Sequence, residues 1–175
     1  MSIVTQATIQ AAIAWTQTDT PNSLFTTSTV ADAGSVSFAK ILSSGTGISQ
    51  INNLWWDTTG TVPTGQLVTL DFSNINRTIL GSTLESNFGN IKAIIIENQS
   101  SGLTESIYVT ATGSGFNYMF NGIASGLIVP PLSPAMFINY RQGWTVDAGH
   151  KVLQLNNLNN VTGINYRAAV MGVGT

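Results

Sequence analysis

The chain has 175 residues, of which 43% are apolar and only 8% charged, and its formal net charge is −2. A length of this order is typical of one domain, and the composition excludes an intrinsically disordered chain, which would combine low hydrophobicity with high net charge. The six basic residues are scattered singly, which excludes a basic stripe for nucleic acid, and the absence of cysteine excludes disulfides and thiolate sites.

The beginning of the chain predicts strands joined by turns. Within Ile3–Trp15, the alternation of Ile9, Ala11, Ile13 and Trp15 favours a strand, although the alanines would suit a helix equally. Two more strands are expected, at Leu24–Val30 and Val36–Leu42. This start lacks the features of a signal peptide, and no stretch approaches the ~20 apolar residues of a membrane span, so we expect neither secretion nor membrane insertion.

The middle of the chain predicts two strands and one short helix. Leu54–Asp57 should be a strand in which Trp55 and Trp56 point to opposite faces, one to the core and one to solvent or a partner. Leu67–Phe72 alternates apolar and polar residues, as half-buried strands do. Asn74–Asn90 places its isoleucines and leucines near helical spacing, so a short helix or turn is expected there.

Ile91–Asn98 is the densest β-branched run in the chain. A continuous apolar run could also belong to a buried helix, but the three successive isoleucines and the Ser100–Gly102 turn cluster favour a strand. We expect this strand to be central and covered on both faces, which places Ile95 in the core. It also implies a second layer of structure.

The remaining residues predict short strands separated by turns, and these strands are Ser106–Thr112, Leu127–Val129, Met136–Tyr140, Trp144–Val146, Val152–Leu155 and Ile164–Val173. Short strands at such spacing with little helix indicate an all-β fold, a single-domain antiparallel β-sandwich of jelly-roll-like type with at most one short helix. Residues 1–30 are expected to form an N-terminal strand and a candidate inter-subunit arm, and residues 31–175 the sandwich.

No local motif announces catalysis. His150, the single histidine, lies in a predicted turn beside Asp147, and a catalytic triad would need distant partners. No pair of carboxylates is set apart by its spacing for glycoside hydrolysis. The segment Gly45–Gly47 lacks the third glycine and the helix of a phosphate-binding loop, so its glycines are expected to serve a turn. The sequence therefore predicts no enzyme, no cofactor and no metal site.

Aromatic side chains are the most informative candidates for binding. Most should belong to the core, but exposed ones could form a subunit interface or a surface on which sugars stack. Low charge with Trp, Tyr and Met available fits an assembling protein. The candidate interface residues are Trp15, Trp55, Trp56, Tyr118, Phe120 and Trp144.

From about Gly45 to its end, the chain resembles a family of small virion proteins of tailed bacteriophages that are encoded among head and structural genes. The segments that carry the resemblance are Gly45–Gly47, Gln50, Asn53–Thr58, Leu70–Phe72, Phe88–Asn98, Gly143–Val146, Gly149, Val152–Asn157, Ile164–Tyr166 and Met171–Gly172. These are turn glycines and strand cores in a fixed order. Where the family carries a Pro-Gly-Gly turn, this chain departs from it with Pro130–Pro134.

The resemblance implies a fold and a setting rather than a reaction. It implies a capsid decoration or cement protein on the phage head surface, a homotrimer whose partners are the major capsid protein and itself, with no nucleic acid or membrane. The alternative is a tail-associated module that recognises a host glycan through its Trp and Tyr side chains. A third class, a cell-wall hydrolase, would require a carboxylate on which turnover depends.

Overall fold

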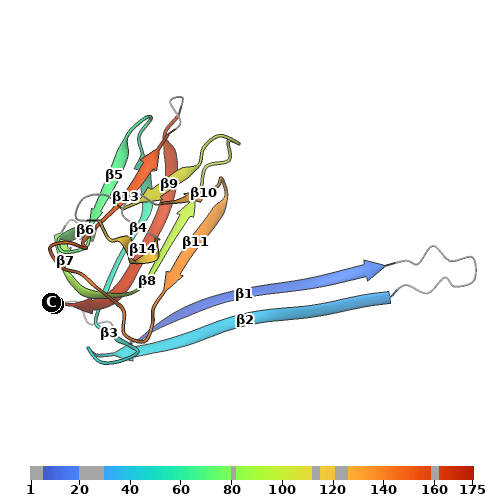
Figure 1. Ribbon diagram of the computed structural model, residues 1–175, viewed down its shortest axis with the longest axis horizontal. Helices are drawn as coiled ribbons and strands as arrows, with labels where there is room; N and C mark the ends of the chain where they lie inside the picture. Colours follow the sequence, from blue (N-terminus) through green and yellow to red (C-terminus); the bar gives the residue numbers. More distant parts are fainter. Residues whose placement is uncertain (1–5, 20–29, 80–81, 112–114, 121–125, 159–161) are drawn as a thin grey trace, which may run out of the picture.

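The computed structural model describes residues 6–19, 30–79, 82–111, 115–120, 126–158 and 162–175. Most of the described chain forms a sandwich of two antiparallel sheets, from which a long hairpin projects (Figure 1). The front sheet has the strand order β11 (Ser133–Ile138), β8 (Phe88–Asn98), β14 (Ile164–Gly174), β4 (Asn53–Val62), with β12 (Trp144–Thr145) also paired to β8. The back sheet has the order β10 (Gly126–Val129), β9 (Ile107–Thr110), β13 (Val152–Asn157), β5 (Leu67–Asp71).

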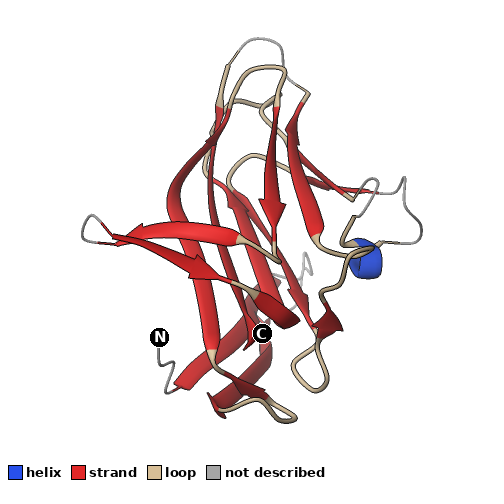
Figure 2. Ribbon diagram, turned by 90° about the vertical axis from the view of Figure 1, so that its left-hand side faces the viewer, coloured by secondary structure: helices blue, strands red, loops and turns tan. Residues whose placement is uncertain are grey.

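The core lies between these two sheets. Alternate residues of each strand point inward, as the two-residue period of a strand requires. Ile94 and Ile96 of β8 meet Leu153 and Leu155 of β13 in one buried cluster, to which Val170 of β14 also belongs. The predicted all-β antiparallel sandwich is confirmed, and the helix in the described part of the chain is one 3₁₀ turn, η1 (Asn117–Met119), shown in Figure 2.

Most of the expected strands are present. Trp55 is buried and Trp56 is 40% exposed, so the two tryptophans point to opposite faces as predicted. The expected strand at Leu24–Val30 lies, apart from Val30, outside the described residues. Gly45, with a φ of 141°, lies in the turn that follows β2, which fits the predicted role of the Gly45–Gly47 glycines.

The short helix expected within Asn74–Asn90 is wrong. The segment instead forms an antiparallel hairpin of β6 (Ile75–Ile79) and β7 (Ser82–Ser86), in which Ile79 pairs with Ser82. A spacing of four residues, as between Ile75 and Ile79, puts two side chains on one face of either a helix or a strand. The sequence pattern therefore did not distinguish them.

The expectation that Ile91–Asn98 is covered on both faces is confirmed for the first half of this run and is wrong at Ile95. β8 is an interior strand of the front sheet, and Ile91 through Ile94 are all buried, but the cover on its outer face does not extend to Ile95. Ile94 is 0% exposed, whereas Ile95 is 38% exposed on the outer face of the front sheet. A run of three isoleucines hides the alternation that would have revealed this difference.

The projecting hairpin, which we call the arm, consists of β1 (Gln6–Asp19) and β2 (Val30–Ser44). The two strands pair antiparallel from Gln6–Ser43 to Asp19–Val30, and β3 (Gln50–Ile51) pairs parallel with the end of β2. With 14 residues in β1, the arm is about 45 Å long at ~3.3 Å per residue. The division expected at residue 30 falls at the first residue of β2, so the arm includes residues on both sides of it.

The two faces of β8 predict different tolerance to charge. Ile94→Asp would bury a carboxylate without a partner and should lower the free energy of unfolding by on the order of 4–5 kcal/mol or prevent folding. Ile95→Asp should cost only ~1–2 kcal/mol, because the outer face is partly solvated. Urea unfolding of dilute protein, followed by tryptophan fluorescence, measures both. Equal losses in the two variants would contradict the assigned faces.

Candidate interaction surface

The arm has one apolar face and one polar face. Residues directly opposite each other in an antiparallel pair lie on the same face. One face of the arm therefore contains every second residue of β1 together with its partner on β2. We call it the apolar arm face. Its cross-strand pairs are Ala7–Leu42, Ile9–Lys40, Ala11–Phe38, Ile13–Val36 and Trp15–Gly34. The opposite, more polar face, which we call the polar arm face, carries alanines and the exposed Ile41 together with Thr8, Gln10, Thr16, Ser35, Ser37 and Ser43.

At its root, the apolar arm face packs on the outer face of the front sheet. Ile9 and Leu42 are buried together with Ala93 of β8 and Ile51 of β3. The partly buried side chains around this second, smaller core are Ala7, Met136, Ile138, Tyr140 and Met171. The root is thus attached to the sandwich by apolar packing, and not only by the chain connection through β3.

Contact with the sandwich continues along the arm as far as Phe38. The rings of Phe38 and Tyr140 have centroids 6.0 Å apart. The Lys40 ammonium lies 5.1 Å from the centroid of the same tyrosine ring, a cation–π distance. Tyr140 therefore contacts two residues of the apolar arm face where the arm leaves the body.

Beyond Phe38 the same apolar face is exposed to solvent. We call this part the distal arm, residues 11–16 and 33–37. Ile13 is 71% exposed, Val36 67% and Trp15 44%. Figure 1 shows the hairpin extending away from the sandwich over this length. The apolar arm face is therefore buried at the root and mostly exposed on the distal arm, where no other part of the described chain covers it as the front sheet covers the root.

Trp15 and Gly34 lie opposite each other in the distal arm. A Cβ atom at Gly34 would collide with the indole ring of Trp15, so the ring lies over the glycine. An aromatic side chain that covers a cross-strand glycine shields exposed backbone. The pair accordingly presents a broad, flat apolar surface near the distal end of the described arm.

The Arg141 carbonyl links a buried lysine of the sandwich to the turn that follows the arm. Lys92 is 3% exposed, and its Nζ donates a hydrogen bond to the carbonyl oxygen of Arg141 at 2.9 Å. The same carbonyl accepts the backbone N–H of Ser49, in the turn between β2 and β3, at 3.1 Å. Burial lowers the pKa of Lys92, because the charged ammonium loses hydration there.

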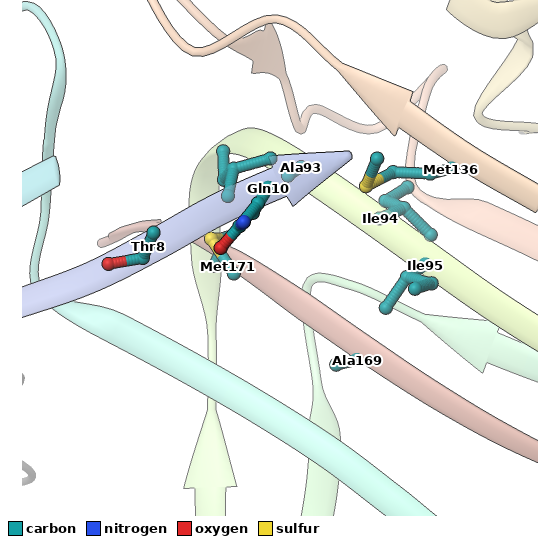
Figure 3. Close-up of a pocket in the computed structure, with 9 residues that line it drawn as sticks. Thr8, Gln10, Ala93, Ile94, Ile95, Met136, Ala169 and Met171 are labelled. Atoms are coloured by element: carbon teal, nitrogen blue, oxygen red, sulfur yellow. The ribbon is translucent and has the colours of Figure 1, made fainter. Parts of the chain in front are cut away.

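The outer face of the front sheet carries a row of side chains beside the arm root. Trp56, Ala169, Ile95 and Met136 are successive cross-strand partners on β4, β14, β8 and β11, and we call them the outer row. An apolar groove of about 140 Å³ lies between part of this row and Thr8 and Gln10 of β1. Figure 3 shows Ile95 and Ala169 together with these two side chains around the groove.

The structure separates the six predicted interface residues. Trp15 lies on the distal arm and Trp56 on the outer row, so both remain candidates for contact with a partner. Trp55 is part of the core, and its Nε1–H donates to the Asn76 carbonyl at 3.0 Å, so it does not form a surface. Phe120 and Trp144 are partly buried and pack against the core, next to Phe137 and Phe116 respectively.

Tyr118, the sixth candidate, is 41% exposed at a different place. Its ring lies 4.8 Å from that of His150, between centroids, and His150 Nδ1 is 3.0 Å from Asp147 Oδ1. Burial, and then the charge of Asp147, raise the pKa of Tyr118. The Gly149 N–H and the His150 side chain hold the pKa of Asp147 below its usual value. Tyr118 is thus not part of the arm surface. It lies beside the polar side chains of His150 and Asp147, and we call these three residues the corner.

Across the described ranges, no group of three or more His, Asp or Glu residues could hold a metal ion. In the same part of the chain, no helix has the length and apolar character needed to span a membrane. Comparison of the chain with protein-family models, with curated proteins and with solved structures finds no match.

Sequence reasoning missed Ile95 as a surface residue. For Val36 and Phe38, the in-phase position of Lys40 indicates a face that is only partly buried, or a lysine that snorkels at its edge, and both residues are exposed. The alternation gave no sign, however, that β2 pairs with β1 instead of joining the sandwich. The arm surface is therefore a product of strand pairing.

The buried ammonium of Lys92 gives a testable pH dependence. Lys92→Met removes the cost of burying a charge, while the Arg141 carbonyl keeps the Ser49 N–H, so stability at pH 7 should be unchanged or higher by ~1 kcal/mol. Because the native pKa is below 10.5, the unfolded chain binds more protons as pH approaches that value. Wild-type stability should therefore rise relative to the variant in this alkaline range.

Urea unfolding at pH 7 and at pH 10 measures this difference. If Lys92→Met lowers the free energy of unfolding at pH 7 by more than ~2 kcal/mol, the ammonium stabilises the protein, which would contradict a net cost of its burial. Lys40→Met is the matched control, since that lysine lies on the arm over Tyr140.

Proposed function

We propose that this protein is a structural protein of a tailed-phage virion, a decoration or cement protein that binds the outer capsid lattice and stabilises the head. The arm is the observation that carries the proposal. A two-stranded hairpin is marginal in water on its own, and an apolar face that continues beyond the body favours contact with another protein surface. The resemblance of residues 45–175 to phage virion proteins supports the virion as the setting.

The physical requirements of such a role fit the molecule. A decoration protein binds many identical sites on a lattice, so several weak contacts made at once give an avidity ~10²–10⁴ above that of each one. A compact sandwich provides a rigid body, and a projecting arm of about 45 Å provides contact with a neighbour. The partners in this proposal are the major capsid protein and further copies of the chain, as a homotrimer.

A glycan-binding module of the virion tail is the second candidate function. It is favoured by the corner formed by Tyr118, His150 and Asp147, where an exposed aromatic ring lies beside polar side chains that can bond sugar hydroxyls. Localisation of the protein in virions by electron microscopy distinguishes the two candidates. Density on the head lattice fits the first and density at the tail fits the second.

Shortening the arm tests the leading proposal. Gln10 pairs with Ala39, so replacing residues 11–38 by Asn-Gly should close the hairpin with a two-residue turn and keep Ile9 and Leu42 on the sandwich. The shortened protein should fold, and its co-sedimentation with heads that lack the protein should fall at least ~10-fold, because simultaneous contacts are lost.

The polar arm face provides the control for this experiment. Ser37→Asp changes an exposed residue of the arm without altering its apolar face, and it should co-sediment as the wild type does. Full occupancy of heads by the shortened protein would refute the role assigned to the arm.

A further inference from the structure

The distal arm and the outer row both adjoin the place where the arm root packs on the sandwich. The outer row is the part of the outer face next to the buried arm root, and Met136 belongs both to the row and to the packing around Ile9 and Leu42. The distal arm is the continuation of the face to which Ile9 and Leu42 belong. The two surfaces are thus continuations of the two sides of one contact within the chain, the packing of the arm root on the outer face of the front sheet.

We propose that the distal arm of one copy docks, through its apolar face, on the outer row of a second copy. In this interface, Ile13 and Val36 of the arm would contact Ile95 and Ala169 of the sheet. The occupant of the outer row is thus a second copy of this chain, and the contact repeats between copies the packing that the arm root makes within one.

The chemistry of the two surfaces is complementary. Aliphatic side chains at Ile13 and Val36 are more than half exposed, and Ile95 lies beside the apolar groove that Ala169 also lines. Burying such side chains in contact with each other removes apolar surface from water, which favours association. The flat surface made by Trp15 over Gly34 extends this contact area.

The arm does not fold back on its own outer row in the structure. Val36 is six residues from Leu42 along β2, which corresponds to about 20 Å of strand. Leu42 packs with Ala93, only two residues from Ile95 along β8. Val36 is 67% exposed, and the arm extends away from the sandwich beyond its root (Figure 1), so the distal arm does not cover the outer row of its own chain.

An arm that docks on a different surface makes a heterologous contact, so closure requires either mutual exchange in a dimer or a ring. The homotrimer in the proposed function corresponds to a ring of three, in which each arm lies on the next sandwich. The inference deepens the proposed function and rests on it for its setting. Its test uses purified protein without heads, so failure of one can be told from failure of the other.

The absence of cysteine makes a cross-linking test specific. In Val36→Cys protein the thiol is converted to a mixed disulfide by exchange with 5,5′-dithiobis(2-nitrobenzoate), which breaks the S–S bond of the reagent and releases one 2-nitro-5-thiobenzoate. The product is mixed with Ile95→Cys protein that has a free thiol. Attack by the Ile95→Cys thiolate releases the coloured thiobenzoate and joins the two chains. A disulfide requires Cα atoms within ~7 Å, so it reports direct docking.

We expect cross-linking at least ~10-fold faster than for Ser37→Cys activated in the same way, because docking raises the effective concentration of the correct pair. Ser37 lies next to Val36 but on the polar arm face, which makes it the matched control. Rates equal to this control would overturn the inference. Faster reaction of activated Val36→Cys with Val36→Cys than with Ile95→Cys would also overturn it, in favour of arms that pair with each other.

A second variant guards against effects of the cysteines themselves. Val36→Asp places a charge in the docked face and should shift the sedimentation coefficient of purified protein toward that of a monomer, whereas Ser37→Asp should not. Both positions are exposed in the single chain, so neither change disturbs the core. An unchanged oligomer in Val36→Asp would contradict the docking. If Val36→Asp protein loses the oligomer but still binds heads, the docking between copies is supported and head binding does not depend on it.

Discussion

The apolar face of the hairpin is the constraint on which the rest of the structure depends. Two strands alone have no second layer, so a hairpin with one apolar face must place that face against something else. The root does so on the outer face of the front sheet, through Ile9 and Leu42. This contact fixes where the arm leaves the sandwich and leaves its distal half without a comparable surface in the described part of the same chain. The proposed assembly with another copy is based on that imbalance rather than on any feature of the sandwich.

The two faces of the front sheet consequently pack against different parts of the chain. Its inner face builds the core with the back sheet, and its outer face receives the arm root at Ala93. The anchoring is partly polar, because the Arg141 carbonyl joins the Lys92 ammonium to the turn at Ser49. A buried lysine is a costly way to hold a loop, since its charge loses hydration, but its hydrogen bond adds a directional contact beside the apolar packing of the root.

The sequence was sufficient for the fold class, since alternating and β-branched runs separated by turns predicted an antiparallel sandwich and the opposite orientation of Trp55 and Trp56. It was insufficient where the two-residue period was hidden or ambiguous. Three consecutive isoleucines concealed that Ile95 faces outward, and a four-residue spacing made β6 resemble a helix. It could not supply strand partners, because pairing depends on contacts between distant segments. For that reason the candidate surface, which exists only because β1 pairs with β2, was predicted in part, through Trp15 and Trp56, and its aliphatic members were not.

Amide hydrogen exchange of the purified protein at increasing concentration tests the central claim most directly, since it reports burial of the arm by a second copy without any substitution. Docking between copies predicts that peptides covering residues 11–16 and 33–37 of the arm, and residues 93–97 of β8, gain protection together as concentration rises. Peptides from the core strand β13 should not change over the same range. Exchange in the distal arm that is fast and independent of concentration, in a protein whose sandwich remains protected, would contradict such docking.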